Sequence, residues 1–437
     1  MKIHVGTTKS NLTSHAGLFQ IGEFFKTSGF RSAIDAVSTV KARKGVPSDS
    51  DIVFCMIALY SIGKPTYEAI EEYRYDPYFR DVIGVRRVPS SETLRQRIEA
   101  LPASITAVVR RWNSAIIAAG FTEVNEKSTE QEEWSESLQI GEEWYTVIDS
   151  DVSVLDNSHS KKEGVSWTYK KCDGYAPMFS YIGKSGYMIN NELREGSQHS
   201  NCGGTEEYFA ETIAFGKQIS VHPLLIVLDS GNDDKKLLQE FDTQGVRFVI
   251  KRNLRKESVS EWLSYAKANA VHKRQARDGS EVYYATCLRE VDFIDEKREV
   301  RIVVVARERT CDETGQMLIE PETTVETYWT NLDVKETEVE EIYHQHGTSE
   351  QYHAELKSDL GVERLPSGKF YANTLHLLFS MVAFNLLRRI GTRLLLTGKS
   401  PGKRGRRMRL RTVLQNVIYL AGLVVSHAGQ LLGMSQT

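Results

Sequence analysis

YHQHGTSEQYHAELK, at residues 343–357, is the stretch of sequence with the most specific pattern. Tyr343, His346, Glu350 and Lys357 follow one another in it at steps of 3, 4 and 7 residues. Because an α-helix turns by about 100° per residue, these steps keep the four side chains within one narrow stripe. The stretch therefore predicts a helix with one carboxylate, Glu350, in line with these neighbours.

Two apolar strands elsewhere in the sequence also carry acidic residues. YTVIDSDVSVL contains Asp149 and Asp151, and PLLIVLDSGND contains Asp229 directly after a continuous apolar run. Carboxylate oxygens are the ligands that Mg²⁺ prefers, and converging carboxylates can hold metal ions for phosphoryl transfer. Two strand aspartates and the helix glutamate thus predict a metal-binding cluster.

The first strand offers two candidates for one ligand position. Asp149 and Asp151 are two residues apart, so both side chains face the same side of the strand. Two buried like charges are costly unless cations compensate them, which favours a metal at this point. Periodicity alone does not choose between the two residues.

The spacing Tyr-x2-Arg-x3-Glu-x6-Lys is typical of the DDE transposases of bacterial insertion sequences, and this chain resembles them, with His346 in place of the arginine. A neutral histidine lacks the permanent charge and the bidentate fork of arginine, so the departure weakens the expected phosphate contact. Further blocks resemble the insertion-sequence thirteen-eighty group, in order, over residues 11–411: NLTSHAGLF, VIDSDVSVLDN, KKEGVSWTYKKCDGYAPM, LDSGNDD and ERLPSGKFYANTLHLLFSMVAFNLLR.

The resemblance implies a cut-and-paste transposase that cleaves DNA at inverted repeats and joins the ends to target DNA. It implies Asp151, Asp229 and Glu350 as catalytic metal ligands for two Mg²⁺ ions, with Mn²⁺ as an alternative metal. Relatives often carry Asp followed at the second position by Ser or Thr, which favours Asp151 with Asp149 as the alternative. Two DNA ends must be cut together, so we expect a homodimer on paired ends.

Basic and aromatic side chains are the expected DNA contacts. Net charge is only −3, but no acidic residue follows Glu363, and the segment from Arg388 to Arg411 contains ten Lys or Arg residues, both ends included. Such an asymmetric basic segment is a common footprint of contact with phosphates, although a solvated tail would show it too. The residues predicted to contact DNA are Tyr343, His346, Lys357, Arg194, Arg95, Arg97, Arg404, Arg406 and Arg407, with Lys170 and Lys171 as further candidates.

Cysteine spacing and the length of the apolar segments indicate the cellular compartment. Five cysteines form no CxxC motif, which fits a reducing compartment. The first residues show no apolar signal segment, and the apolar run at 417–425 is too short to span a bilayer. We therefore expect a cytoplasmic, nucleoid-associated bacterial protein with no membrane contact.

Along the chain, helical periodicity gives way to a β-β-β-α-β-α-β order after residue 144, as in a ribonuclease-H-like mixed sheet flanked by helices. We therefore predict an α/β fold with an all-α N-terminal domain and a β-rich insertion. The predicted segments are residues 1–140, helical and DNA-binding with an acidic linker from 123; 141–254, the first part of the catalytic core; 255–326, the insertion; 327–391, the second part of the core; and 392–437, a basic helical region.

Local signals refine three of these segments. Ser90 or Ser91 predicts the N-cap of ETLRQRIEAL, which is either a helix-turn-helix recognition helix or a surface helix of a plain bundle. TSEQ at 348–351 fits a capping box, with Thr348 bonding forward and Gln351 bonding back. RTVLQNVIYLAGLVVSHAG, at 411–429, predicts a closing helix.

Three rival functions remain open at this stage. A ribonuclease-H-like nuclease would cut DNA without joining it, and a domesticated transposase would bind DNA without catalysis. A glycoside hydrolase with paired carboxylates is the third. The basic segment and the lack of an aromatic-rich strand-end pattern argue against it.

Overall fold

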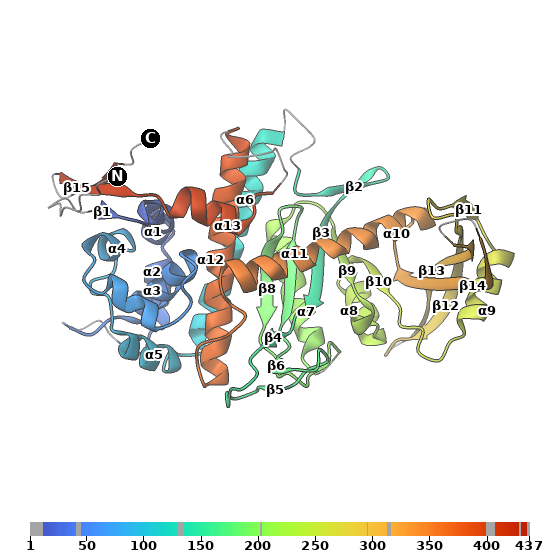
Figure 1. Ribbon diagram of the computed structural model, residues 1–437, viewed down its shortest axis with the longest axis horizontal. Coiled ribbons are helices and arrows are strands. Elements are labelled where there is room, and N and C mark those ends of the chain that lie inside the picture. The colour runs from blue at the N-terminus through green and yellow to red at the C-terminus, as the bar shows by residue number, and fades with distance from the viewer. Residues whose placement is uncertain are drawn as a thin grey trace.

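Three parts of the chain lie in a row along the long axis of the molecule (Figure 1). Helices from the N-terminal region form one end, a mixed β-sheet occupies the middle, and long antiparallel strands form the other end. The mixed α/β architecture expected from the sequence is therefore confirmed. The computed structural model describes residues 12–40, 45–128, 135–201, 203–294, 296–312, 316–398, 407–427 and 430–434.

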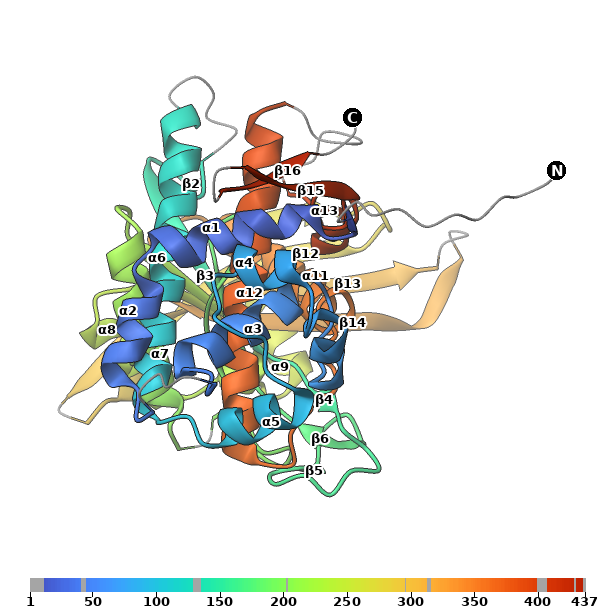
Figure 2. The ribbon, with the colours of Figure 1, turned by 90° about the vertical axis from the view of Figure 1, so that its left-hand side faces the viewer.

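The N-terminal helices surround α3 (Asp49–Ser61), in which every residue is buried. A capping box starts this helix, because the Ser48 hydroxyl accepts from the N–H of Asp51 and the Asp51 carboxylate accepts from the N–H of Ser48. α3 packs against the long helix α12 (Phe370–Leu396), so both ends of the chain contribute to one hydrophobic core (Figure 2). The other helices of this region are the 3-10 helices Ala16–Leu18 and Glu68–Tyr73, α1 (Phe19–Thr27), α2 (Phe30–Val37), α4 (Pro77–Val82), α5 (Ser91–Glu99) and α6 (Ser104–Ser128).

Helix α6 extends further than the sequence predicted. It continues to Ser128, past the predicted start of the acidic linker at residue 123. Ile117, Phe121 and Val124 follow at helical spacing and are all buried, so packing holds the helix together despite its polar composition. Residues 129–134 of the predicted linker lie outside the described part of the chain.

The central sheet has the strand order of a ribonuclease-H-like core. Strands β3, β9 and β10 are parallel neighbours, and β7 and β8 continue the sheet antiparallel beyond β3. This confirms the predicted β-β-β-α-β-α-β order. The elements are β2 (Leu138–Ile140), β3 (Glu143–Val152), β7 (Met178–Ile182), β8 (Tyr187–Glu192), α7 (Thr205–Ile219), β9 (Leu224–Leu228), the 3-10 helix Ser230–Asn232, α8 (Lys235–Thr243) and β10 (Arg247–Lys251).

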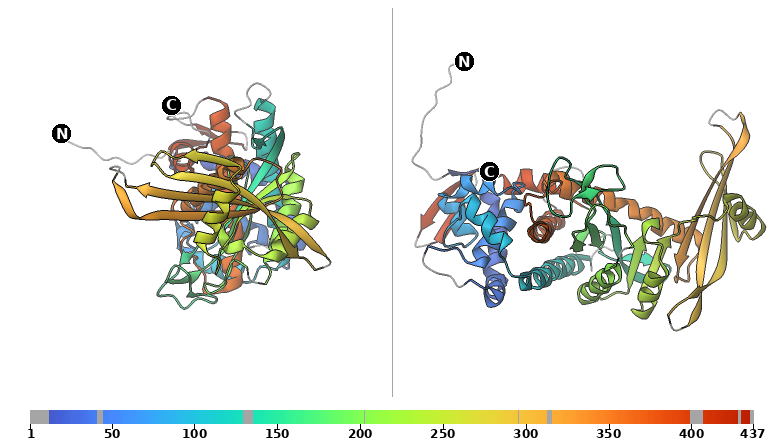
Figure 3. Two further views of the ribbon diagram at one scale, coloured as in Figure 1. Left: turned by 90° about the vertical axis from the view of Figure 1, so that its right-hand side faces the viewer. Right: turned by 90° about the horizontal axis from the view of Figure 1, so that it is seen from below.

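The β-rich insertion continues the central sheet instead of forming a separate one. Its last strand pairs antiparallel with β10, and Ile250 lies opposite Trp329. Viewed from below, these long strands project well beyond the core helices (Figure 3). The insertion contains α9 (Val259–Ala268), β11 (His272–Gln275), β12 (Glu281–Asp292), β13 (Lys297–Cys311) and β14 (Met317–Thr330).

The stretch at 343–357 lies on a long, interrupted helical rod that crosses from the insertion to the central sheet (Figure 1). The predicted capping box at Thr348 was wrong. Thr348 has helical backbone angles and makes no side-chain cap, because the chain is already helical before it. The rod consists of α10 (Glu336–Gln345), the 3-10 turn His346–Thr348, α11 (Ser349–Ala354) and the π-helical turn Glu355–Asp359.

Helix α12 is long and apolar enough to cross a membrane, with a mean hydropathy of 1.3 over its most apolar window. However, 83% of that window is buried inside the protein. It contacts α6, α3 and β8, as the central helix of a folded core does. We therefore interpret α12 as a core helix.

The closing helix predicted for residues 411–429 was wrong beyond Ile418. Up to Ile418 the chain forms α13 (Leu410–Val413) and a π-helical turn (Leu414–Ile418). After Ile418 it forms strands. Val424 and Val425 are β-branched, which favours extended backbone when a partner strand is present. That partner sheet consists of β1 (Leu12–Thr13), β15 (Gly422–His427) and β16 (Gln430–Met434), and a second small sheet consists of β4 (Leu155–Asp156), β5 (Ser166–Trp167) and β6 (Asp173–Tyr175).

Candidate active site

Asp151 and Asp229 lie at the carboxyl ends of two neighbouring parallel strands. In the register of β3 and β9, Ser150 is level with Leu228, so the residues that follow are level too. Neighbouring strands are about 4.8 Å apart. The two carboxylates therefore share one edge of the sheet, the position where sites form in sheets of this kind.

Asp229 also shapes the turn that follows its strand. Its Oδ1 accepts hydrogen bonds from the backbone N–H of Gly231 (3.1 Å) and from Nδ2 of Asn232 (2.8 Å). Asp229 thus caps the 3-10 helix Ser230–Asn232, as expected for an aspartate that starts a loop. These bonds fix the orientation of the carboxylate at the strand end.

Asp149 lies deeper in the sheet than Asp151. It is level with Val227 and only 9% exposed, whereas the Asp151 side chain is 25% exposed. Asp149 lines a pocket of about 230 Å³, partly open to solvent, that is also lined by Lys184 and Tyr181. Asp151 is the aspartate of this strand that is level with Asp229.

Helix α11 reaches the same site through a residue that the sequence analysis did not select. The Nε2 atom of His353 lies 3.5 Å from Oδ2 of Asp151. The other ring nitrogen, Nδ1, hydrogen-bonds with the hydroxyl of Tyr181 at 3.1 Å. His353 is three residues after Glu350, so its helical spacing from the predicted ligand was the signal that could have identified it.

Glu350 lies on α11 with its side chain exposed. In the part of the chain that the structure describes, the three potential ligand atoms that lie within 4.8 Å of one another belong to Glu326, Glu340 and His344. The structure therefore brings Asp151 and Asp229 to one strand edge, but among the described residues Asp151, Asp229 and Glu350 do not form a trio with that spacing. Catalytic contacts often tighten only in the complex with substrate.

Burial and the negative charge of this edge raise the pKa of two tyrosines, Tyr169 and Tyr343. The pKa of Tyr169 is raised to about 12, first by burial of its hydroxyl and then by the charges of Asp151 and Asp229. Burial also raises the pKa of Tyr343, and the charge of Asp229 adds to this effect. Tyr343 packs against the ring of Tyr328, with ring centroids 5.0 Å apart. The phenols thus lie within the electrostatic reach of both aspartates.

Lys357 points inward in this structure. Its Nζ donates to the carbonyl oxygen of Val154 at 2.5 Å and lies 3.8 Å from a carboxylate oxygen of Glu363. Burial lowers the pKa of Lys357. The lysine therefore ties the π-helical turn to the chain that follows Asp151, and its predicted contact with a DNA phosphate stays a prediction.

Arg194, one of the predicted DNA contacts, lies inside the protein. Arg194 is almost fully buried, its Nε donates to Glu192 at 2.5 Å, and its Nη1 donates to the carbonyl oxygen of Ser200. Burial and these partners keep the charge of Arg194 inside the fold, and its predicted contact with DNA stays a prediction.

Other predicted basic contacts are engaged within the protein or lie outside the described residues. Arg97 pairs with the buried Asp49, and Arg407 pairs with the buried Glu355. Arg95 pairs with two glutamates of its own helix and remains partly exposed. Arg404, Arg406 and the side chain of His346 lie outside what the structure describes.

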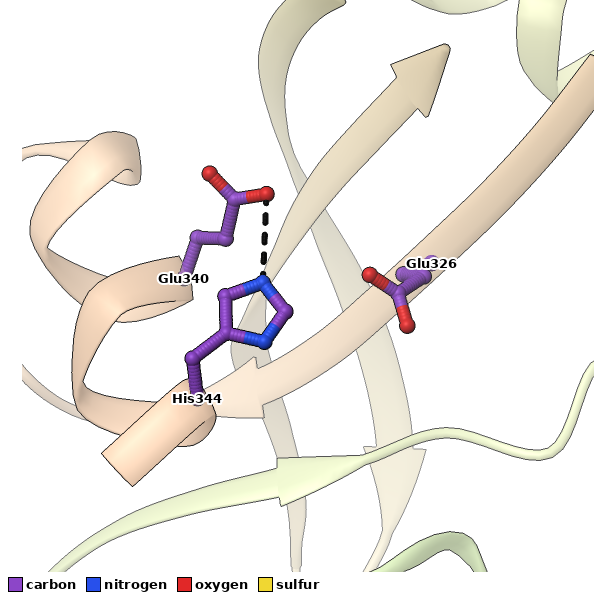
Figure 4. A group of neighbouring side chains, drawn as sticks. All are labelled: Glu326, Glu340 and His344. Carbon is purple, nitrogen blue, oxygen red and sulfur yellow. Dashed lines mark hydrogen bonds and ion pairs between the residues drawn. The ribbon is translucent and has the colours of Figure 1, made fainter. Parts of the chain in front are cut away.

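The trio with metal-ligand spacing is Glu326, Glu340 and His344 (Figure 4). Its carboxylates already have cationic partners. Glu340 pairs with Arg274 and with Arg307, and Glu326 pairs with Lys251 at 2.5 Å. Divalent ions would have to displace these cations, so we interpret the trio as an ion-pair network that joins α10 to the insertion strands.

Comparisons with known proteins identify the family of the chain. No curated protein matches the chain. A solved structure described as the cryo-EM structure of a piggyBac transposase synaptic complex with hairpin DNA is 13% identical, with a TM-score of 0.42; the match covers 94% of this chain and 82% of that one. The family model described as transposase DDE domain group 1 matches residues 1–434, nearly the whole chain. The protein therefore belongs to the DDE transposase family.

Proposed function

We propose that this protein cleaves DNA at transposon inverted repeats and transfers the strands into target DNA, with Asp151, Asp229 and Glu350 as its catalytic residues. The observation that carries the proposal is the level position of Asp151 and Asp229 at the ends of parallel strands. Family membership supports it, because DDE names three acidic residues that act together. Glu350 lies on the helix that reaches this edge through His353.

The residues of the strand edge fit divalent metal ions. Their donors are hard carboxylate oxygens, which suit Mg²⁺ and also Mn²⁺. When bound, two such ions would activate the attacking oxygen and stabilise the leaving oxygen at the phosphorus. Asp151 and Asp229 would hold them, and Glu350 would complete the set when α11 closes on DNA.

The strand register favours Asp151 over Asp149 as the first ligand. Asp151 is level with Asp229, whereas Asp149 lies two residues deeper, beside Val227. Asp149 lines the pocket that Lys184 and Thr348 also line. We assign Asp149 to the support of the strand edge and Asp151 to the metal.

The proposed function includes DNA contacts, an oligomeric state and a cellular location. Tyr343, His346 and Lys357 would contact the DNA backbone near the cut, together with Arg95, Arg404 and Arg406. The protein would act as a homodimer on paired ends, in the bacterial cytoplasm at the nucleoid. Membership of the insertion-sequence thirteen-eighty group is also part of this proposal.

The test is cleavage of DNA that carries the flanking inverted repeat, with Mg²⁺ and with excess chelator. Glu350→Gln should abolish cleavage and retain DNA binding. Glu341→Gln is the matched control, because Glu341 is another exposed helical glutamate on the same rod. Equal loss in both variants, or cleavage that survives in Glu350→Gln, would remove Glu350 from the catalytic set.

Asp151→Asn and Asp149→Asn test the choice of first ligand. We expect Asp151→Asn to abolish cleavage at every metal concentration. Asp149→Asn should leave residual cleavage that more Mg²⁺ increases. The reverse result would make Asp149 the ligand.

A second candidate is a DNA-binding protein that has lost catalysis. It is favoured because Glu350 is exposed and because, among the described residues, Asp151, Asp229 and Glu350 do not group at metal-ligand spacing. Binding without cleavage by the parent protein would support this candidate. A nuclease without strand transfer is distinguished by supplying pre-cleaved 3′-hydroxyl ends and a target plasmid. Joined products would exclude it.

A further inference from the structure

A short segment near the end of the chain, residues 407–411, packs against the helical rod that carries Glu350. Helix α13, which begins in this segment, contacts both the π-helical turn Glu355–Asp359 and helix α12. Two arginines of the segment, Arg407 and Arg409, pair with acidic side chains of that turn. The rod is therefore held by residues far away from it in the sequence.

Glu355 is the centre of this contact. Its side chain is only 3% exposed, and it pairs with Arg388 of α12 at 2.9 Å and with Arg407. The backbone N–H of Leu410 donates to the same carboxylate at 3.2 Å. Arg388 is also buried, and its Nη1 donates to the carbonyl oxygen of Met408 at 3.0 Å. Removing one partner from a buried ion pair leaves the other charge uncompensated, so these groups hold one another in place.

Arg407 extends the contact along helix α11. Its Nη2 donates to Oε1 of Gln351 at 2.8 Å, and Gln351 directly follows Glu350 in the sequence. The guanidinium carbon of Arg407 lies 4.8 Å from the centroid of the Tyr352 ring. Together with the ion pair to Glu355, these contacts span α11 from its first turn to its C-cap.

Helix α11 is thus held from two sides. Gln351 and Glu355 are four residues apart, so they share the face that meets Arg407. His353 lies two residues from each of them, about 200° around the helix, on the face that meets Asp151. Glu350 projects between these two faces, and its position depends on both contacts.

We propose that Arg407 is a positioning residue for Glu350: it fixes helix α11 and thereby sets where Glu350 stands relative to Asp151 and Asp229. This inference rests on the proposed function and adds to the site a residue from outside the stretch at 343–357. In this role Arg407 acts through Gln351 and contacts neither DNA nor metal.

The surroundings of Arg407 favour positioning over a direct contact with DNA. Its side chain is only 16% exposed, and a carboxylate, an amide and an aromatic ring already surround its guanidinium. A phosphate would have to compete with the buried Glu355. Arg409 is the contrast within the same segment, because its side chain is 52% exposed and its partner, Asp359, lies beyond the end of α11.

The first measurement is hydrogen–deuterium exchange of the free protein, followed for peptides that cover α11. Arg407→Gln should raise the exchange rate of the α11 amides roughly 10- to 100-fold, as expected for local opening after loss of hydrogen bonds from a charged group. Arg409→Gln is the matched control, because it removes an ion pair of the same segment but no contact with α11. It should leave these amides unchanged. The measurement needs neither metal nor DNA, so it does not depend on cleavage.

The second measurement is a Mg²⁺ titration of cleavage, with DNA binding measured separately in excess chelator. Arg407→Gln should raise the Mg²⁺ concentration for half-maximal cleavage by about 10-fold or more, as loss of an orienting residue does, and should retain binding. Arg409→Gln should keep the metal requirement of the parent. Arg407→Lys keeps a charge beside Glu355 but lacks the fork of the guanidinium, so it should recover part of the metal affinity.

A milder variant guards against a folding defect. Gln351 is exposed, and Gln351→Met removes only its bond to Arg407 while keeping a similar helix propensity. It should shift amide exchange and metal requirement in the same direction as Arg407→Gln, with the melting temperature of the parent. If Arg407→Gln does not fold, Gln351→Met decides, and parent-like exchange and metal requirement in it would overturn the inference.

The outcomes separate this inference from the proposed function. Unchanged α11 exchange in Arg407→Gln, or equal increases in Arg407→Gln and Arg409→Gln, would overturn it even if the parent cleaves DNA. Faster exchange in Arg407→Gln alone would support the hold on α11 even if the parent proved unable to cleave. Loss of DNA binding with an unchanged metal requirement would also overturn it, because Arg407 would then act as a DNA contact.

Discussion

His353 Nε2 lies 3.5 Å from Oδ2 of Asp151, which joins helix α11 directly to the strand that carries the proposed first metal ligand. The same histidine bonds with Tyr181 of β7. It thereby holds the helix of Glu350 against the sheet. We infer that His353 positions Asp151 and α11.

We predict that His353→Gln raises the Mg²⁺ concentration needed for half-maximal cleavage by about 10- to 100-fold, as loss of a residue that orients a metal ligand does. Metal titration of the cleavage rate is the measurement. His344→Gln, an exposed histidine on the same rod, is the control. An unchanged metal requirement in His353→Gln would show that the contact with Asp151 has no positioning role.

Glu340 is the buried centre of the network between α10 and the insertion. Its carboxylate accepts from the Tyr284 hydroxyl at 2.6 Å and pairs with Arg274 and Arg307. We predict that Glu340→Gln lowers the free energy of unfolding by about 1–3 kcal/mol, because it leaves buried donors poorly satisfied. Thermal melting measures this, and Glu341→Gln, an exposed neighbour, should melt like the parent.

The same network predicts a pH dependence. Burial raises the pKa of Glu340, but the bonds from Tyr284 and Arg307 lower it more, so the net shift is downward from 4.5. A carboxylate with a depressed folded pKa stabilises the protein above its unfolded pKa, and this contribution is lost as pH falls through the folded value. The difference in melting temperature between parent and Glu340→Gln should therefore be full at neutral pH and should shrink below about pH 4.5. A difference that is constant with pH would contradict the charge network.

Gly186 lies in the β7–β8 turn with φ of 67°, and a Cβ there would overlap the ring of Tyr352 on α11. Gly245 has a similar φ of 65° but open space around it. We predict that Gly245→Ala costs about 1–2 kcal/mol of backbone strain alone. Gly186→Ala should cost more and should also lower cleavage, since α11 must shift away from the sheet. Equal effects of the two substitutions on melting and cleavage would show that the Tyr352 contact does not position α11.

Much of the fold was predictable because its signals are local. The continuous apolar run before Asp229 became strand β9. The ends of α6 and the strand β15 were not predictable in this way. Buried contacts of Phe121 extend the first, and pairing of Leu423 with Leu12, far away in the sequence, creates the second.

The acidic residues of the candidate site were predictable from the sequence, but the structural features that position them were not. Residue type and strand position identified Asp151 and Asp229, whereas their equal level depends on the register of two separate strands. Arg194 looked like a surface cation, because sequence does not show that Glu192 and Ser200 enclose it. The 3-10 and π-helical turns on either side of α11 also shift the phase of the stripe that contains Glu350.

The shared core of α3 and α12 has a consequence during protein synthesis. Tyr60 of α3 bonds with the ring of His376 at 3.0 Å, across 316 residues of chain. At about 5–20 residues per second, a ribosome needs roughly 15–60 s to make that intervening chain. For this interval α3, whose residues are all buried in the folded protein, has emerged without the helix that covers it. The nascent N-terminal region is thus a natural client for chaperones, and the rate of translation sets how long it must be protected.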